Sequence, residues 1–177
     1  MDIFSRVWIA NRLPLVSGAL LEVGSFNYPG QDDVALRPVV SGLVTSYLGV
    51  DMYPGPGVDQ VINENAAVWP FSANSFDTIV SVTLLENIKN PTAHMREMFR
   101  ILRPSGTLFL SSFFAAPIHD FPNDYWRFTP SCLKMLVEGA GLVVFGDLTP
   151  SQSIKLGPHI PHIMANPATV RLIAKKP

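Results

Sequence analysis

The sequence predicts an α/β fold in which helices cover both faces of a seven-stranded, mostly parallel sheet whose last strand is antiparallel. Apolar strand-like runs alternate with segments of helical spacing, as in a parallel sheet covered by helices. A proline-rich polar connection, and no capped helix, separates the last two runs. Because parallel crossovers usually need a helix, these two strands are expected to be antiparallel. The 177 residues, 47% of them hydrophobic, suffice for a single domain over residues 1–177.

Seven short runs carry the strand signal. The run FDTIVSV at 76–82 is apolar almost throughout, which is typical of a strand buried on both faces. Gly24 ends the first run, and PGPG at 54–57 leaves room only for a turn between the second and third. The expected strands are 19–23, 45–52, 58–63, 76–82, 106–114, 141–148 and 169–176.

Two helices have clear start and stop signals. Asn90 and Thr129 are good N-caps, and each precedes a proline at the first helical position. Apolar residues then recur at helical spacing, until Pro104 stops the first run and Gly141 ends the second. Two weaker helices are expected at 3–12 and 33–42.

Composition excludes several classes of function. The net charge is −1, so the chain lacks the basic surface that nucleic acids or anionic membranes attract. The one cysteine, Cys132, excludes a disulfide framework and a multi-thiolate metal site. No apolar run approaches the roughly 20 residues of a membrane helix, and no signal peptide is recognisable. We therefore expect a cytoplasmic protein without a metal, a nucleic-acid partner or a membrane partner.

The stretch LEVGSFNYPG at 21–30 reads as a strand end that leads into a ligand-binding loop. Ligands of such sheets bind beyond the carboxyl ends of the strands, and Gly24 would let one approach the backbone closely. Glu22 could accept a hydrogen bond from a water or an ammonium group, and Asp51 stands where such folds hold a ribose diol. The G-x-G-x-x-G pattern that a dinucleotide needs is missing. The loop therefore suits a cofactor with a ribose but no pyrophosphate.

Four stretches in order resemble the motifs of class I S-adenosylmethionine-dependent methyltransferases of the type 11 group. They are LEVGS, YLGVDM, NAAVWPFSANSFDTIVSV and EMFRILRPSGTLFLS. The similarity runs from about residue 18 to 148 and more loosely to the end. It implies a Rossmann-like sheet with an antiparallel seventh strand, S-adenosylmethionine as the cofactor, and methyl transfer as the reaction.

The resemblance also implies the cofactor contacts. Asp51 would hold the ribose, Met52 would lie against the adenine, and Asn65 would take the place of an acid that accepts from the adenine amino group. The expected cofactor-binding residues are Glu22, Gly24, Ser25, Asp51, Met52, Asn65, Ala66 and Ser81.

Some features depart from the family pattern. The glycine-rich loop is reduced to Gly24, with Gly30 further on, and Phe26 stands in place of a glycine and is expected to pack. Asn87 stands where many relatives have histidine. Helices that many relatives place around the first strands are missing, so the helix complement is reduced and a homodimer could cover the cofactor.

The stretch PIHDFPNDYWRFTP at 117–130 is the expected acceptor side, because it follows the fifth strand on the same rim. The expected catalytic residues are His119 and Asp124, and the expected substrate-binding residues are Tyr125 and Arg127. His119 is the preferred base for an acceptor hydroxyl. The alternative makes Arg127 a structural clamp on Asp120 or Asp124, with the aromatic residues in the core.

The favoured function is methyl transfer to an oxygen or nitrogen of a small-molecule acceptor. The alternative is a non-catalytic module that keeps the fold and the cofactor site, which the altered loop and Asn87 favour. A nicotinamide-dependent oxidoreductase is opposed by the missing glycine pattern. His159 and His162 lie three residues apart without nearby acids, which is a poor metal signal.

Overall fold

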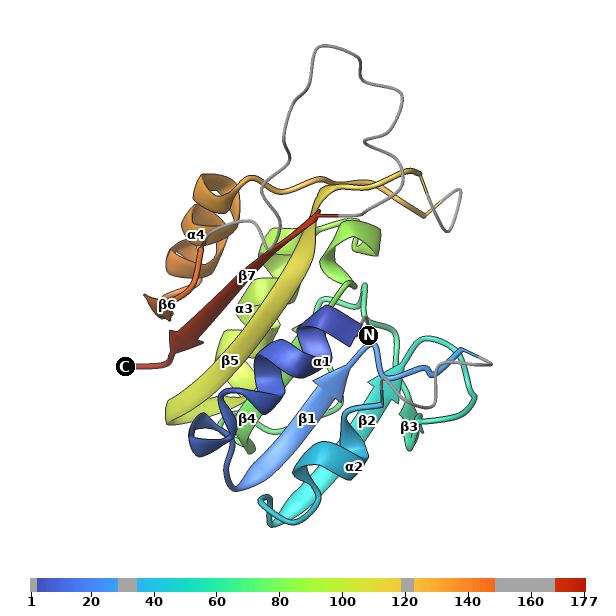
Figure 1. Cartoon of the computed structure of the whole chain (residues 1–177), viewed down its shortest axis with the longest axis vertical. Helices are drawn as coiled ribbons and strands as arrows, with labels where there is room; N and C mark the ends of the chain where they lie inside the picture. Colours follow the sequence, from blue (N-terminus) through green and yellow to red (C-terminus); the bar gives the residue numbers. More distant parts are fainter. Residues whose placement is uncertain (1–2, 29–34, 119–122, 149–167) are drawn as a thin grey trace.

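A computed structural model describes residues 3–28, 35–118, 123–148 and 168–177 (Figure 1). Its strands are β1 (Ala19–Val23), β2 (Ser46–Asp51), β3 (Gln60–Val61), β4 (Phe76–Val82), β5 (Leu102–Ala115), β6 (Val143–Gly146) and β7 (Ala168–Lys175). Its helices are α1 (Ile3–Ala10), α2 (Arg37–Val40), α3 (Pro91–Ile101) and α4 (Pro130–Gly139), with short 3-10 turns η1 (Leu13–Leu15) and η3 (Leu85–Asn87).

The seven strands form one sheet in the order β3-β2-β1-β4-β5-β7-β6. β7 lies between β5 and β6 and is antiparallel to both, while the other neighbours are parallel. The chain therefore has the Rossmann-like fold of class I methyltransferases, and the expected antiparallel pairing of the last two strands is confirmed.

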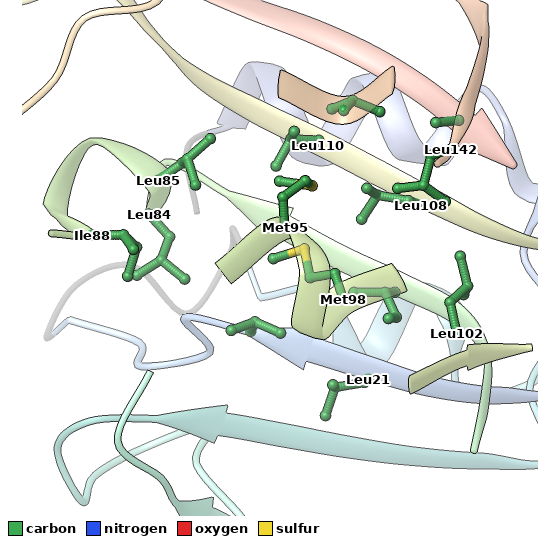
Figure 2. Packing of buried hydrophobic residues seen from close by; sticks show 14 of the residues in the cluster. Leu21, Leu84, Leu85, Ile88, Met95, Met98, Leu102, Leu108, Leu110 and Leu142 are labelled. Atoms are coloured by element: carbon green, nitrogen blue, oxygen red, sulfur yellow. The ribbon is translucent and has the colours of Figure 1, made fainter. Parts of the chain in front are cut away.

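Helices cover both faces of the sheet. α1 and α2 pack on one face, where Trp8 meets Phe109 edge to face with ring centroids 5.6 Å apart. α3 and α4 pack on the other, where Met95 and Met98 lie against strand residues such as Leu108 (Figure 2). Burial of these apolar side chains is the main force that holds the layers together.

Both predicted helix starts are confirmed. The Asn90 side chain accepts a hydrogen bond from Ala93 N at 3.1 Å, and the Thr129 hydroxyl accepts one from Cys132 N at 3.1 Å. Gly141 follows α4 with a φ of 98°, which glycine adopts without strain.

Several predicted boundaries were wrong. The third strand covers 60–61 rather than 58–63, and α2 is only four residues long. α3 ends at Ile101, and Pro104 lies inside β5 instead of ending the helix. The pairing of β4 with β5 is interrupted between Leu102 and Thr107, so the missing N–H of Pro104 leaves no ladder bond unmade.

Candidate functional site

The loops that follow β1, β2 and β4 lie at one edge of the sheet, because these strands are parallel neighbours (Figure 1). Most of the predicted cofactor residues lie on these strand ends and loops. This edge is where ligands bind in sheets of this kind.

The turn after β1 is built on Gly24. Its φ is 79°, and a Cβ at this position would lie 3.3 Å from Leu84. The N–H groups of Gly24 and Ser25 both donate to the Val50 carbonyl, at 2.9 and 3.0 Å. Any other residue here would have to adopt a strained backbone conformation against Leu84.

The loop after β2 packs directly onto the loop after β1. Asn27 N donates to the Pro56 carbonyl at 2.8 Å, and a Cβ on Gly55 would lie 2.2 Å from the Phe26 ring. Phe26 is half-buried and meets Tyr28 edge to face at 5.0 Å. Phe26 therefore packs against the neighbouring loop, as its apolar bulk predicts.

Asp51 connects the two loops. One carboxylate oxygen accepts from Phe26 N and the other from Tyr53 N, each at 3.1 Å. Each oxygen keeps a further lone pair, so the carboxylate can still accept from a ribose hydroxyl.

Beside Asp51 lies a cavity of about 370 Å³ with mostly apolar walls. Its lining residues are Met52, Tyr53, Val61, Ile62 and Asn63. The Asn65 side chain lies nearby: its Nδ2 approaches Met52 Sδ at 3.6 Å, and its Oδ1 accepts from Lys89 N at 2.9 Å. Ala66 packs against the core.

Glu22 lies on the α2 side of the sheet, next to a smaller cavity of about 240 Å³ that Arg37 and Asn27 also line. The Tyr47 hydroxyl donates to its carboxylate. Burial raises the pKa of Glu22 to about 7, because the charged form loses its hydration. The Glu22 carboxyl group is therefore mostly protonated at acidic pH. An ammonium group beside it would favour the ionised carboxylate.

Glu64 is a residue of this edge that the sequence analysis missed. It is 1% exposed, and burial together with the charge of Asp51 raises its pKa to about 8. Its carbonyl contacts the Nδ1 of buried His94 at 3.2 Å, and burial lowers the pKa of His94 to about 4. Both groups are therefore neutral near pH 7. The only sequence signal was an acid directly before Asn65.

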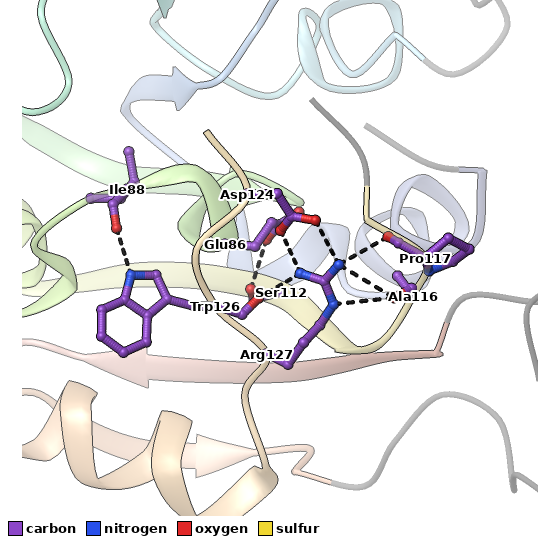
Figure 3. A network of polar contacts seen from close by, with 8 residues as sticks. All are labelled: Glu86, Ile88, Ser112, Ala116, Pro117, Asp124, Trp126 and Arg127. Carbon is purple, nitrogen blue, oxygen red and sulfur yellow. Dashed lines mark hydrogen bonds and ion pairs between the residues drawn. The ribbon is translucent and has the colours of Figure 1, made fainter. Parts of the chain in front are cut away.

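The predicted acceptor segment is attached to η3. The backbone N–H groups of Tyr125 and Trp126 donate to the Glu86 carbonyl at 2.8 and 3.1 Å. The Trp126 indole N–H donates to the Ile88 carbonyl at 2.8 Å, and the Ser112 hydroxyl donates to the buried Glu86 carboxylate at 2.7 Å (Figure 3).

Arg127 and Asp124 form a two-pronged ion pair with N–O distances of 2.5 and 2.7 Å (Figure 3). The guanidinium also donates to the Ala116 and Pro117 carbonyls. This is the structural clamp that the alternative interpretation described, and Phe128 is buried as that interpretation expected. The Tyr125 ring is exposed, and its hydroxyl donates to Asn123 Oδ1 at 3.2 Å. His119, Asp120, His159 and His162 lie outside the described residues.

Residues 44–110 match the type 11 family, described as a methyltransferase domain. The match covers 67 of the 177 residues. No curated protein matches the chain in sequence. Together with the fold, this match makes the chain similar to the S-adenosylmethionine-dependent methyltransferases.

Solved structures support the fold assignment. The YcgJ protein of Bacillus subtilis superposes with a TM-score of 0.71 at 13% identity, covering 99% of each chain. A methyltransferase in complex with the Haloferax volcanii Trm112 methyltransferase activator gives 0.69 at 17% identity, covering 98% of this chain and 90% of that one. Haemonchus contortus phosphoethanolamine N-methyltransferase 2, solved with S-adenosylmethionine, gives 0.67 at 14% identity, covering 99% of this chain and 53% of that one.

The edge of the sheet where β1, β2 and β4 end has polar groups that suit a polar ligand. The side-chain oxygens Ser25 Oγ, Glu64 Oε1, Ser81 Oγ and Asn87 Oδ1 are buried without a hydrogen-bond partner. Buried polar atoms are nearly always satisfied, so a ligand or ordered water is expected to contact them. The polar groups and the apolar cavity beside Met52 together fit S-adenosylmethionine, the cofactor of this class.

Two kinds of feature are absent from the described residues. No helix among them has the length and apolar character needed to cross a bilayer. Within the same ranges, no cluster of histidine, cysteine or acidic side chains is arranged to hold a metal ion.

Proposed function

We propose that this methyltransferase domain transfers a methyl group to an oxygen or nitrogen of a small-molecule acceptor. The observation that carries the proposal is the apolar cavity at the end of β2 and β3, which is lined by Met52 and Tyr53, the two residues that follow Asp51. An apolar slot next to an acid fits an adenosine, since the base needs apolar walls and the ribose needs acceptors.

The proposed cofactor contacts follow from this placement. Asp51 accepts from the ribose, Met52 lies against the adenine, and Asn65 faces its edge. Gly24, Ser25 and Ser81 line the path toward the methionine end, where the Glu22 carboxylate would favour an ammonium group. When bound, the cofactor supplies an electrophilic methyl group on its sulfonium. The chain's own contribution is to bind and align the acceptor, which can be worth several kcal/mol.

On the acceptor side we propose that His119 takes the proton from an acceptor hydroxyl. This rests on its place in the sequence, shortly after the end of β5 at Ala115 and shortly before the residues that bind the Glu86 carbonyl. Tyr125 is exposed and available to the acceptor. Asp124 and Arg127 bind each other, so we give them the role of positioning this segment rather than of base and substrate clamp.

A second function is favoured by one observation. The Arg127–Asp124 pair takes two polar groups away from a potential acceptor, as expected of a module that binds the cofactor without turning it over. The similarity to the methyltransferase solved in complex with Trm112 supports a role as part of a complex, and a homodimer would also cover the site.

Calorimetric titration with S-adenosylmethionine, S-adenosylhomocysteine and NAD tests the proposal. We expect the first two to bind and NAD not to bind. Asp51→Ala should weaken binding by about 1–3 kcal/mol, because a hydrogen-bond partner is lost. Asp59→Ala is the matched control. Asp59 also accepts a hydrogen bond from the backbone, from Gly49 N at 2.7 Å, but it does not line the cavity beside Met52 that is proposed to hold the adenosine. Equal effects of the two variants would refute the ribose assignment, and cofactor binding without methyl transfer to any acceptor in a broad panel would favour the non-catalytic module.

A further inference from the structure

A cavity of about 580 Å³ lies beside the first turn of α3 and the outward side of α4, and none of the proposed cofactor or acceptor contacts uses it. α3 and α4 pack against each other on the same face of the sheet (Figure 1). The walls include Lys89, Thr92, Trp126, Phe128, Met135 and Leu136. Its size is within the range of small-molecule sites.

One wall is a fixed aromatic surface. The Trp126 indole is held by its hydrogen bond to the Ile88 carbonyl, and Phe128 N donates to the Phe113 carbonyl at 2.8 Å. The two rings lie 6.3 Å apart with planes only 32° from parallel. In Figure 3 the indole points away from the Arg127–Asp124 pair. The Trp126 indole is therefore a preformed aromatic surface, which favours a planar ligand over a flexible chain.

Two of the lining side chains leave apolar surface in water. Met135 is 69% exposed and Trp126 is 42% exposed, and both line the same cavity. Methionine adapts its shape to a bound apolar group at little cost. A ligand in this cavity would remove both side chains from solvent, which is favourable.

The charge of the lining has one sign. Lys89 is the only lysine or arginine among the residues that line this cavity, and no lining residue is acidic. The described part of the chain places no carboxylate in an ion pair with Lys89. The Lys89 ammonium and the Thr92 hydroxyl are thus available to an anionic group at one end of an otherwise apolar cavity.

We propose that the cavity between α3 and α4 binds a planar aromatic carboxylate, with the ring against Trp126 and Phe128 and the carboxylate at Lys89. The site is separate from the cofactor edge. It adjoins that edge through residue 89, whose backbone N–H binds the Asn65 side chain.

The test measures binding of 2-naphthoate to the full chain by isothermal titration calorimetry. We expect saturable binding at one site, with Lys89→Gln weakening it about fivefold, as loss of a partly exposed ion pair predicts. The neutral analogue 2-naphthalenemethanol should bind more weakly than 2-naphthoate and should not respond to Lys89→Gln. Dodecanoate, which carries the same charge on a flexible chain, should bind more weakly than 2-naphthoate.

Two exposed apolar positions provide matched variants. Met135→Ala should weaken 2-naphthoate binding about threefold, while Val143→Ala, on the exposed face of β6, should leave it unchanged. Binding of 2-naphthoate should persist in the presence of saturating S-adenosylhomocysteine. Any one of five results would overturn the proposal. These are no saturable binding, equal effects of the two alanine variants, insensitivity to Lys89→Gln, tighter binding of dodecanoate, and displacement by S-adenosylhomocysteine.

Discussion

Glu64→Gln should stabilise the protein at neutral and alkaline pH and have little effect at acidic pH. Glu64 is buried and keeps its proton in the folded state up to about pH 8, because burial and the charge of Asp51 raise its pKa. In the unfolded chain the same carboxyl group loses its proton near pH 4.5. Between these values the folded state binds more protons, so the free energy of unfolding falls as the pH rises.

The magnitude follows from the size of this window. Each pH unit inside it lowers the free energy of unfolding by about 1.4 kcal/mol. From pH 4.5 to pH 7 the loss is therefore about 3 kcal/mol. Glutamine has the shape of the protonated acid and cannot ionise, so the variant should avoid this loss.

Urea unfolding of wild type and variant at matched pH values between 4.5 and 8.5 measures the effect. The difference between the two proteins at each pH cancels the contributions of Glu22 and His94, whose pKa values are also shifted. Glu138→Gln, at an exposed position of α4, is the control and should show a small difference at every pH. A constant difference between wild type and Glu64→Gln across this range, or a variant less stable at pH 8 than wild type, would refute the argument.

Three further predictions concern the two loops and the acceptor segment. Phe26→Gly should lower the melting temperature more than it changes cofactor affinity, because Phe26 packs on the neighbouring loop; a large affinity change with unaltered melting would contradict this. Arg127→Ala should destabilise the fold by about 1–3 kcal/mol in chemical unfolding, since it leaves the side chain of Asp124, 1% exposed, without its ion-pair partner; an unchanged stability with a raised acceptor KM would restore the substrate-binding role. His119→Ala should keep cofactor affinity and lose about 10²–10⁴-fold in turnover once an acceptor is known, and unchanged turnover would exclude it as the base.

The parts of the fold that local sequence determines were predicted well. β1 and β4 have the predicted bounds, because a short and mainly apolar run is typical of a buried strand. Asn90 and Thr129 cap their helices because a cap depends on residues only two or three positions away.

The start of β5 depends on tertiary structure. Pro104 is a common helix terminator, but here α3 has already ended and Leu102 pairs with Phe76 of β4. The next paired residue of β5 is Thr107, and Ser105, with a φ of 64°, donates its N–H to the Lys176 carbonyl. Pairing with β4 and β7 determines this arrangement, and neither contact is visible in the local sequence.

In the candidate site too, some features follow from the local sequence and others depend on tertiary contacts. The motifs predict cofactor contacts for Asp51 and Gly24. The local sequence left open whether Arg127 binds an acid such as Asp124 or faces a ligand, since two polar side chains three residues apart in a loop can do either. Glu64 was missed because its neighbours Asn63 and Asn65 are exposed, which is typical of a solvated turn. Its burial results from how this turn packs against β2 and α3.

The loop contacts explain how this edge keeps its shape with few glycines. In the wider family several glycines let the first loop pass close to the cofactor. Here the close approach is between two protein loops, since Gly55 and Gly57 on the second loop leave space for Phe26 and Ser25 on the first. Asp51 joins them by accepting from Phe26 N. Glycines of the second loop thus allow the two loops to pack closely, and the residue expected to hold the ribose also holds the first loop.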